Sequence, residues 1–247
     1  MSLAAQAPDA RSNAPRSRLW LRPLAVALAT TALVTALSYG MPDAYAATAV
    51  GLGFLAATYA VALRRSHPLP PEHYGLGLGG LLNPEPLSPS RIAKESARAL
   101  GWALGLALAI FPLFWIGYVW WWKPRHTFVP GALPAIGDDV LGQLLVIALP
   151  EEAFYRGYLQ TALDDAWKPR WKILGAELGW GVLVSSALFA LGHFATEVHP
   201  NRLAVFFPAL VFGWLRARTK GVGAGIVFHA LCNLFAAYLA RSYGMGR

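Results

Sequence analysis

Long runs of apolar residues, separated by short polar segments, make up most of the chain. A helix needs roughly 20 predominantly apolar residues to cross the ~30 Å hydrocarbon core of a bilayer. The pattern therefore predicts an all-α, polytopic transmembrane helix bundle of about seven spans, with eight as an alternative. The expected spans are residues 19–38, 44–63, 97–122, 140–163, 175–198, 203–215 and 222–240.

The polar segments divide the chain into three parts. Residues 1–18 are rich in Ala, Pro and Arg without apolar periodicity, which predicts a disordered tail. Residues 19–137 form an N-terminal transmembrane region with a loop at 64–96, and residues 138–241 form a second transmembrane region. Arginines before the first apolar run, and small residues near position 46, also fit a cleaved secretory signal.

Composition supports a membrane protein and excludes an ordinary soluble enzyme. Hydrophobic residues make up 56% of the chain and charged residues only 14%, against about 25% charged residues in soluble domains. The net charge is +8, but the basic residues cluster between apolar runs instead of forming a stripe, so the expected partner is the lipid bilayer and not nucleic acid. The single cysteine, Cys232, excludes an internal disulfide and a cysteine-based zinc site.

The 21 Lys and Arg residues also predict an orientation. Most lie in the N-terminal tail, in the segment 64–98 and in the loops around residues 168–172 and 216–220. Because cytoplasmic loops carry an excess of Lys and Arg, the N-terminus and the loop 64–96 are expected in the cytoplasm. We expect a multi-pass protein of the bacterial inner membrane.

Two adjacent acids and an arginine lie inside the fourth apolar run, at Glu151, Glu152 and Arg156. An ionisable side chain at the bilayer centre costs ~2.5 kcal/mol or more unless it is paired or hydrated. Glu152 and Arg156 are four residues apart and are expected to form an ion pair on one helix face. Glu151 lies about 140° round the helix from Arg156 and needs another partner. The alternative is one ionic cluster that only fixes helix packing.

Further polar residues lie in the fifth and seventh apolar runs. Phe189 and His193 share a helix face, as do His229 and Asn233, because each pair is four residues apart. A single histidine in a membrane helix is usually a packing residue. Two histidines, an asparagine and an otherwise unpaired glutamate on three spans instead predict a hydrated polar centre, which is typical of a pathway or an active site.

These side chains are suited to hydrolysis by water. Glu151 in an apolar surround can take a proton from water near neutral pH, and His193 can orient the same water. His229 and Asn233 can donate to the oxyanion of a tetrahedral intermediate. Because Gly-x-Ser-x-Gly is absent, direct attack by water is favoured over a serine nucleophile, and hydrolysis without a metal is the preferred form. A zinc ion held by Glu151, His193 and His229 is the alternative, although His-Glu-x-x-His is absent.

At these residues the chain resembles the type II CAAX prenyl endopeptidase and bacteriocin-processing family of intramembrane proteases, also called the CPBP or ABI family. The family signatures Glu-Glu-x-x-x-Arg, Phe-x-x-x-His and His-x-x-x-Asn occur in order on separate predicted spans, within residues 138–240. The resemblance implies that residues 138–241 are the catalytic core. It implies Glu151 as the water-activating residue with His193, His229 with Asn233 as the oxyanion site, and Glu152, Arg156 and Phe189 as supporting residues.

The sequence thus predicts an endopeptidase that cuts a peptide bond in or beside the membrane anchor of a protein or peptide substrate. Myxosortase-like relatives trim the C-terminal anchors of exported proteins, and the resemblance implies a similar substrate class here. No cofactor is expected, with zinc as the alternative. A proton-coupled transporter that uses Glu151, His193 and His229 as a relay is a hypothesis from another class. The chain has no inverted second copy of the motifs, which argues against a repeat-built transporter.

Overall fold

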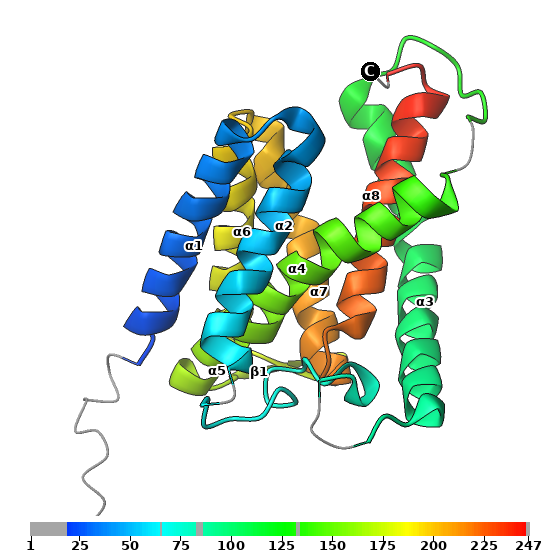
Figure 1. Cartoon of the computed structure of the whole chain (residues 1–247). Coiled ribbons are helices and arrows are strands. Elements are labelled where there is room, and N and C mark those ends of the chain that lie inside the picture. Colours follow the sequence, from blue (N-terminus) through cyan, green and yellow to red (C-terminus); the bar gives the residue numbers. More distant parts are fainter. Residues whose placement is uncertain (1–18, 65, 83–85, 132–133, 246–247) are drawn as a thin grey trace, which may run out of the picture.

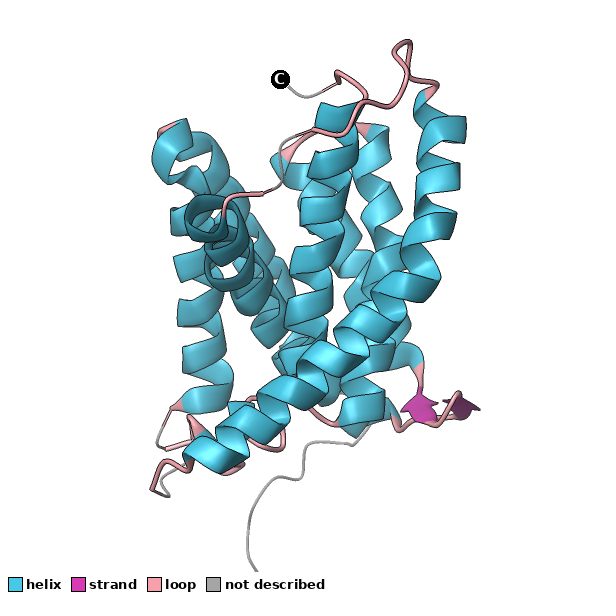
Figure 2. Cartoon of the chain, turned by 90° about the vertical axis from the view of Figure 1, so that its right-hand side faces the viewer, coloured by secondary structure: helices cyan, strands magenta, loops and turns pink. Residues whose placement is uncertain are grey.

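Helices account for nearly all of the secondary structure in the computed structural model, which describes residues 19–64, 66–82, 86–131 and 134–245. The helices pack side by side, and two short strands lie at one end of the bundle (Figures 1 and 2). This arrangement confirms the all-α helix bundle. The tail expected at residues 1–18 lies outside the described residues.

The first half of the chain forms α1 (Leu21–Gly40), α2 (Asp43–Thr58), the short helices η2 (Tyr59–Leu63) and η3 (Leu78–Gly80), and α3 (Pro89–Trp122). The second half forms η4 (Ile136–Ala148), α4 (Leu149–Glu152), η5 (Ala153–Gln160), α5 (Thr161–Trp167), β1 (Trp171–Ile173), β2 (Ala176–Leu178), α6 (Trp180–Thr196), η6 (Pro200–Val205), α7 (Phe206–Thr219) and α8 (Gly223–Ser242). Apolar contacts between the helices of the two halves form the main core.

Four helices in the described part of the chain are long and apolar enough to cross a membrane. They are Leu21–Gly40, Asp43–Leu63, Pro89–Trp122 and Gly223–Ser242. α6 is apolar but has only 17 residues, which gives a length of about 25 Å. α7 has 14 residues and spans about 21 Å. The protein is therefore an integral membrane protein in which α6 and α7 are shorter than the four spanning helices.

The helical run from Ile136 to Trp167 is continuous and crosses the bundle obliquely (Figure 1). η4 and η5 within it have the wider π-type hydrogen bonding, which is frequent at functional sites. Pro150 near the centre has no N–H to donate to the carbonyl of Val146 one turn earlier. Gly51 of α2 lies against this carbonyl. The absence of a side chain there lets α2 pack closely beside the segment that carries Glu151.

Two segments differ most from the expected boundaries. The fifth span was expected from residue 175, but residues 171–178 form an antiparallel hairpin with Trp171 opposite Leu178, and α6 begins only at Trp180. Leu174 and Gly175 make its turn with positive φ angles. The loop expected at 64–96 is also shorter, because α3 begins at Pro89. Ser88 caps this helix by accepting a hydrogen bond from the Arg91 N–H at 3.4 Å.

Candidate active site

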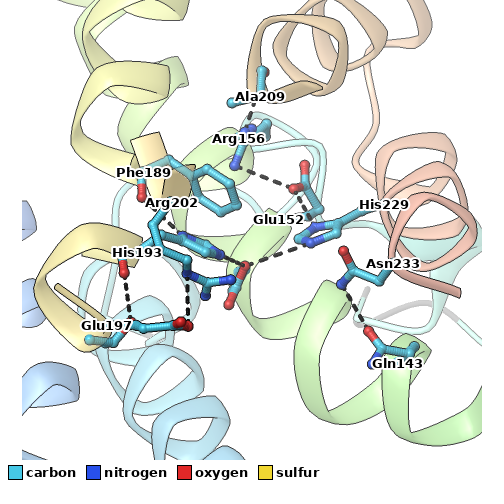
Figure 3. Close-up of polar contacts among 12 residues, drawn as sticks. Gln143, Glu152, Arg156, Phe189, His193, Glu197, Arg202, Ala209, His229 and Asn233 are labelled. Carbon is cyan, nitrogen blue, oxygen red and sulfur yellow. Dashed lines mark hydrogen bonds and ion pairs between the residues drawn. The ribbon is translucent and has the colours of Figure 1, made fainter. Parts of the chain in front are cut away.

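The three motifs meet at one place inside the bundle (Figure 3). Glu151 and Glu152 come from α4, Arg156 follows on η5, and His193 comes from α6. α8 contributes His229 and Asn233. The side chains of Glu152 and Arg156 are completely buried, and those of Glu151, His193 and His229 are 12%, 20% and 5% exposed. Residues far apart in sequence thus form one largely enclosed polar cluster.

Glu152 and Arg156 form the ion pair expected from their spacing. Arg156 Nη1 lies 3.3 Å from Glu152 Oε1. The guanidinium also stacks 4.3 Å over the ring of Phe189, which explains why an aromatic residue stands four positions before His193. The two charges are held by this pair and by the aromatic face, so Glu152 is not the free acid of the site.

Glu151 points away from Arg156 and toward the two histidines, as the helix geometry predicts. Its Oε2 lies 3.9 Å from His193 Nε2 and 3.8 Å from His229 Nε2. These distances are too long for direct hydrogen bonds, and Glu151 Oε2 is buried without a hydrogen-bond partner among the described residues. A separation above 3.5 Å between polar atoms is one that a water molecule can bridge.

The other ring nitrogen of each histidine has its own acceptor. His193 Nδ1 lies 3.0 Å from the carbonyl oxygen of Phe189, and His229 Nδ1 lies 3.1 Å from Glu152 Oε1. Because a carbonyl and a carboxylate only accept hydrogen bonds, both Nδ1 atoms carry a proton. Nε2 of each ring is therefore directed at Glu151. His229 also stacks on Phe212 with ring centroids 4.8 Å apart, which fixes its plane.

Asn233 has a partner that the sequence reasoning missed. Its Nδ2 donates to Gln143 Oε1 at 2.8 Å, across the gap between α8 and η4 (Figure 3). One N–H of the Asn233 amide is thereby fixed, and the second N–H is left to point elsewhere. An uncharged polar residue in an apolar run was the available signal, because its amide must find a partner when it is buried in a bundle.

Two further hydrogen bonds join the buried face of η5 to the backbone of α7. Arg156 Nη2 donates to the Ala209 carbonyl at 3.3 Å, and Gln160 Nε2 donates to the Gly213 carbonyl at 3.1 Å. The two donor residues are four positions apart on η5, and the two acceptor residues are four positions apart on α7. A side chain at position 213 would lie 2.8 Å from Gln160 Oε1, so glycine is required for this approach. The bonds set the position of the motif helix along α7.

Glu151, His193 and His229 are also the three residues proposed for zinc. Among the described residues, no group of three His, Cys, Asp or Glu side chains is arranged to hold a metal ion. The two Nε2 atoms do face the same carboxylate oxygen, and their Nδ1 atoms have acceptors of the kind that orient metal-binding histidines. The donor types fit zinc, but their arrangement in this structure is not that of a formed site.

Apolar spanning helices around a buried acid and two histidines define an integral membrane protein with its candidate active site inside the bundle. Residues 139–235 match the family model described as type II CAAX prenyl endopeptidase Rce1-like. All three motifs lie within this segment, and the match confirms the resemblance seen in the sequence. In this segment the chain is similar to a family of membrane endopeptidases, which are hydrolases. No curated protein and no solved structure matches the chain.

Proposed function

We propose that the protein hydrolyses a peptide bond in or beside a membrane anchor, with water activated by Glu151 and His193. The expected substrates are exported or lipid-anchored proteins that are processed near their C-terminus. The observation that carries the mechanism is the unpartnered Glu151 Oε2, which faces Nε2 of both His193 and His229 at 3.9 and 3.8 Å. Glu151 Oε2 and His193 Nε2 are both acceptors in this arrangement, and a water molecule between them supplies the two protons that they need.

In the proposed reaction, a water molecule donates hydrogen bonds to Glu151 and to His193 Nε2. Glu151 removes one proton as the oxygen attacks the scissile carbonyl carbon, and it then delivers that proton to the leaving amine. His193 keeps its position because its Nδ1 proton is held by the Phe189 carbonyl. Glu151 is the base in preference to Glu152, because Glu152 is already paired with Arg156 and hydrogen-bonded to His229.

In the proposed reaction, His229 and Asn233 donate hydrogen bonds to the oxygen of the scissile carbonyl. His229 lies 3.8 Å from Glu151 and 3.1 Å from Glu152, and with a proton on Nε2 it can act as a donor toward the oxyanion. Its Nε2–H and the free N–H of Asn233 then donate to the oxyanion. Removal of one oxyanion donor typically lowers kcat by about 10²–10³-fold.

Purified protein in lipid vesicles tests the reaction directly. Membrane and secreted proteins from cells with and without the protein are compared by mass spectrometry, and candidates with a changed C-terminus are supplied as substrates. Wild-type protein should cut them and the Glu151→Gln variant should not. Ion flux through the vesicles without cleavage would favour the transporter hypothesis instead.

Zinc catalysis by the same residues predicts a different response to chelators. Under the proposed mechanism, dialysis of the purified protein against a strong chelator leaves the cleavage rate unchanged. A loss of activity that is restored by added Zn²⁺ would assign Glu151, His193 and His229 as metal ligands, because metal binding to such a site is reversible.

We also propose that the N-terminus is cytoplasmic and that the substrate is cut near the outward-facing end of its anchor. The support is the charge pattern, with Lys220 in a basic loop and the segment 197–205 on the opposite side. In a Cys232→Ser background, a membrane-impermeant thiol reagent applied to intact cells should label Val198→Cys, which is 73% exposed, and should not label Lys220→Cys. The reverse labelling would invert the topology.

A further inference from the structure

Arg202 is a cation at the edge of the candidate active site that the proposed mechanism does not use. It lies on η6, the short helix after α6, and its side chain is 38% exposed. Figure 3 shows its guanidinium beside the ring of His193, with which it interacts electrostatically. A positive charge is therefore placed next to the groups that attack the peptide bond.

Short-range hydrogen bonds fix Arg202 relative to His193. The Glu197 N–H donates to the His193 carbonyl at 3.2 Å, and the His199 N–H donates to the Glu197 carbonyl at 2.7 Å. The Arg202 N–H then donates to the His199 carbonyl at 2.9 Å. The backbone from the catalytic histidine to the arginine is thus a chain of linked turns, so Arg202 is held in place before any substrate arrives.

Structural contacts do not account for this arginine. Its only ion pair among the described residues joins Nε to Glu197 Oε2 at 3.4 Å, and the Glu197 side chain is 65% exposed. Exposed ion pairs contribute little to stability. Arg202 Nε is buried without a well-formed hydrogen bond, and no hydrogen bond or ion pair among the described residues engages the two terminal nitrogens. The guanidinium keeps donors available at the site.

The chemistry of those donors selects one class of ligand. A guanidinium presents parallel N–H groups whose spacing matches the two oxygens of a carboxylate. Glu197 already shows that a carboxylate binds there, and its exposed position makes it easy to displace. The carboxylate that can reach Arg202 when the active site is occupied belongs to the substrate.

We propose that Arg202 binds a carboxylate of the substrate on the His193 side of the scissile bond, and so determines which anchors are cut. The inference rests on the proposed function, since it names the substrate class of the same site. The carboxylate is either an Asp or Glu side chain or a free C-terminus. Arg202 acts on binding and leaves water activation to Glu151 and His193.

Synthetic peptides with one apolar span, in vesicles of phosphatidylethanolamine and phosphatidylglycerol, test this. Pairs of peptides differ only by Glu against Gln at one flanking position, or by a C-terminal acid against its amide, which separates the two sources of the carboxylate. Products are identified by mass spectrometry. Wild-type protein should cut one acidic member faster than its neutral partner by about tenfold or more, as expected for a charge-assisted hydrogen bond.

Variants assign that preference to the arginine. Arg202→Gln should lose the preference for the acidic peptide, because cleavage of that peptide alone slows, mainly through a higher KM. Arg202→Lys should restore part of the preference. Glu197→Gln, which frees the guanidinium, should keep it. The matched control is Arg241→Gln, which removes an exposed arginine near the end of α8. Equal cleavage of acidic and neutral members by the wild type, or equal slowing of both in Arg202→Gln, would overturn the proposal.

Failure of the proposed function gives a different result. If wild-type protein cuts no peptide, the same pairs are tested for binding by the shift they cause in thermal unfolding of the full-length protein. An acidic preference that disappears in Arg202→Gln then supports the carboxylate site without the protease activity. Equal shifts for acidic and neutral members would overturn it.

Discussion

α3 and η5 are helices of the same largely apolar chain, but most of α3 is exposed at the surface of the protein whereas η5 is buried inside it. Only 11% of the apolar window of α3 is buried inside the protein, and Leu108, Leu113 and Ile116 are 69–81% exposed. All eight residues of η5 are buried, including Arg156 and Gln160. The exposed side chains of α3 face the bilayer, which accepts any apolar residue, whereas the side chains of η5 are buried among the neighbouring helices. The same kind of substitution should therefore have a large effect in η5 and a small effect in α3.

The largest effects are expected at the two adjacent acids before η5. Glu151→Gln removes the proposed base, so turnover should fall by about 10²–10⁴-fold, the range of general base catalysis. The folded yield should hardly change, because Glu151 forms no close ion pair with any residue that the structure describes. Cleavage rates and size-exclusion profiles of the purified variants measure the two quantities.

Glu152→Gln is the matched control for this substitution. It removes the charge that is paired with the buried Arg156 and replaces the carboxylate that faces His229 by a neutral amide. Breaking a buried pair in this way costs ~3 to 5 kcal/mol, so folded yield should fall strongly. Equal loss of yield in both variants would contradict the division of roles between the two acids.

Substitution of one leucine in each helix tests the difference between η5 and α3 without changing a residue of the candidate active site. Leu159 of η5 is fully buried and Leu113 of α3 is 69% exposed. Leu159→Ala should lower stability by about 2–5 kcal/mol through the cavity it leaves, while Leu113→Ala should change it by about 0.5 kcal/mol or less. Thermal unfolding in detergent micelles of one composition measures both. Similar losses would show that α3 is packed against protein in the membrane, for example in an oligomer.

The smallest effect is expected at Gln143. Gln143→Leu removes the acceptor that orients Asn233, so kcat should fall by about tenfold, the value of one buried hydrogen bond, with KM little changed. Gln143→Glu keeps an acceptor and should retain more activity. Leu145→Ala, at an exposed position of the same helix, is the control. A rise in KM alone would place Gln143 in substrate binding instead.

The sequence allowed the site to be predicted better than the boundaries of the helices. Charges in an apolar run are costly, so Glu151, Glu152 and Arg156 stood out, and the four-residue spacing correctly paired Glu152 with Arg156. Gln143 carries no charge and drew no attention. The hairpin was missed because Trp171 and Ile173 continue into an apolar run, and apolar content alone does not distinguish a short strand from the start of a helix.

The same limit explains the start of α3. Ser88 and Pro89 are good residues for the beginning of a helix, but the residues that follow are polar and charged, and hydrophobicity alone places the span later. The structure begins the helix at the cap and carries it 34 residues to Trp122. Capping residues thus indicate where a membrane helix begins, whereas hydropathy indicates only the position of its apolar part.

The two hydrogen bonds between η5 and α7 make the chain unequally tolerant of insertions and deletions. Loss of one residue between Ala209 and Gly213 would rotate the following part of α7 by about 100° and remove the Gly213 carbonyl from Gln160. Extra residues in the loop between Thr196 and Pro200 would leave both bonds intact but would move Arg202 away from His193. Length variation in that loop is therefore expected to accompany a change of substrate, whereas length variation within α7 is expected to be absent from functional relatives.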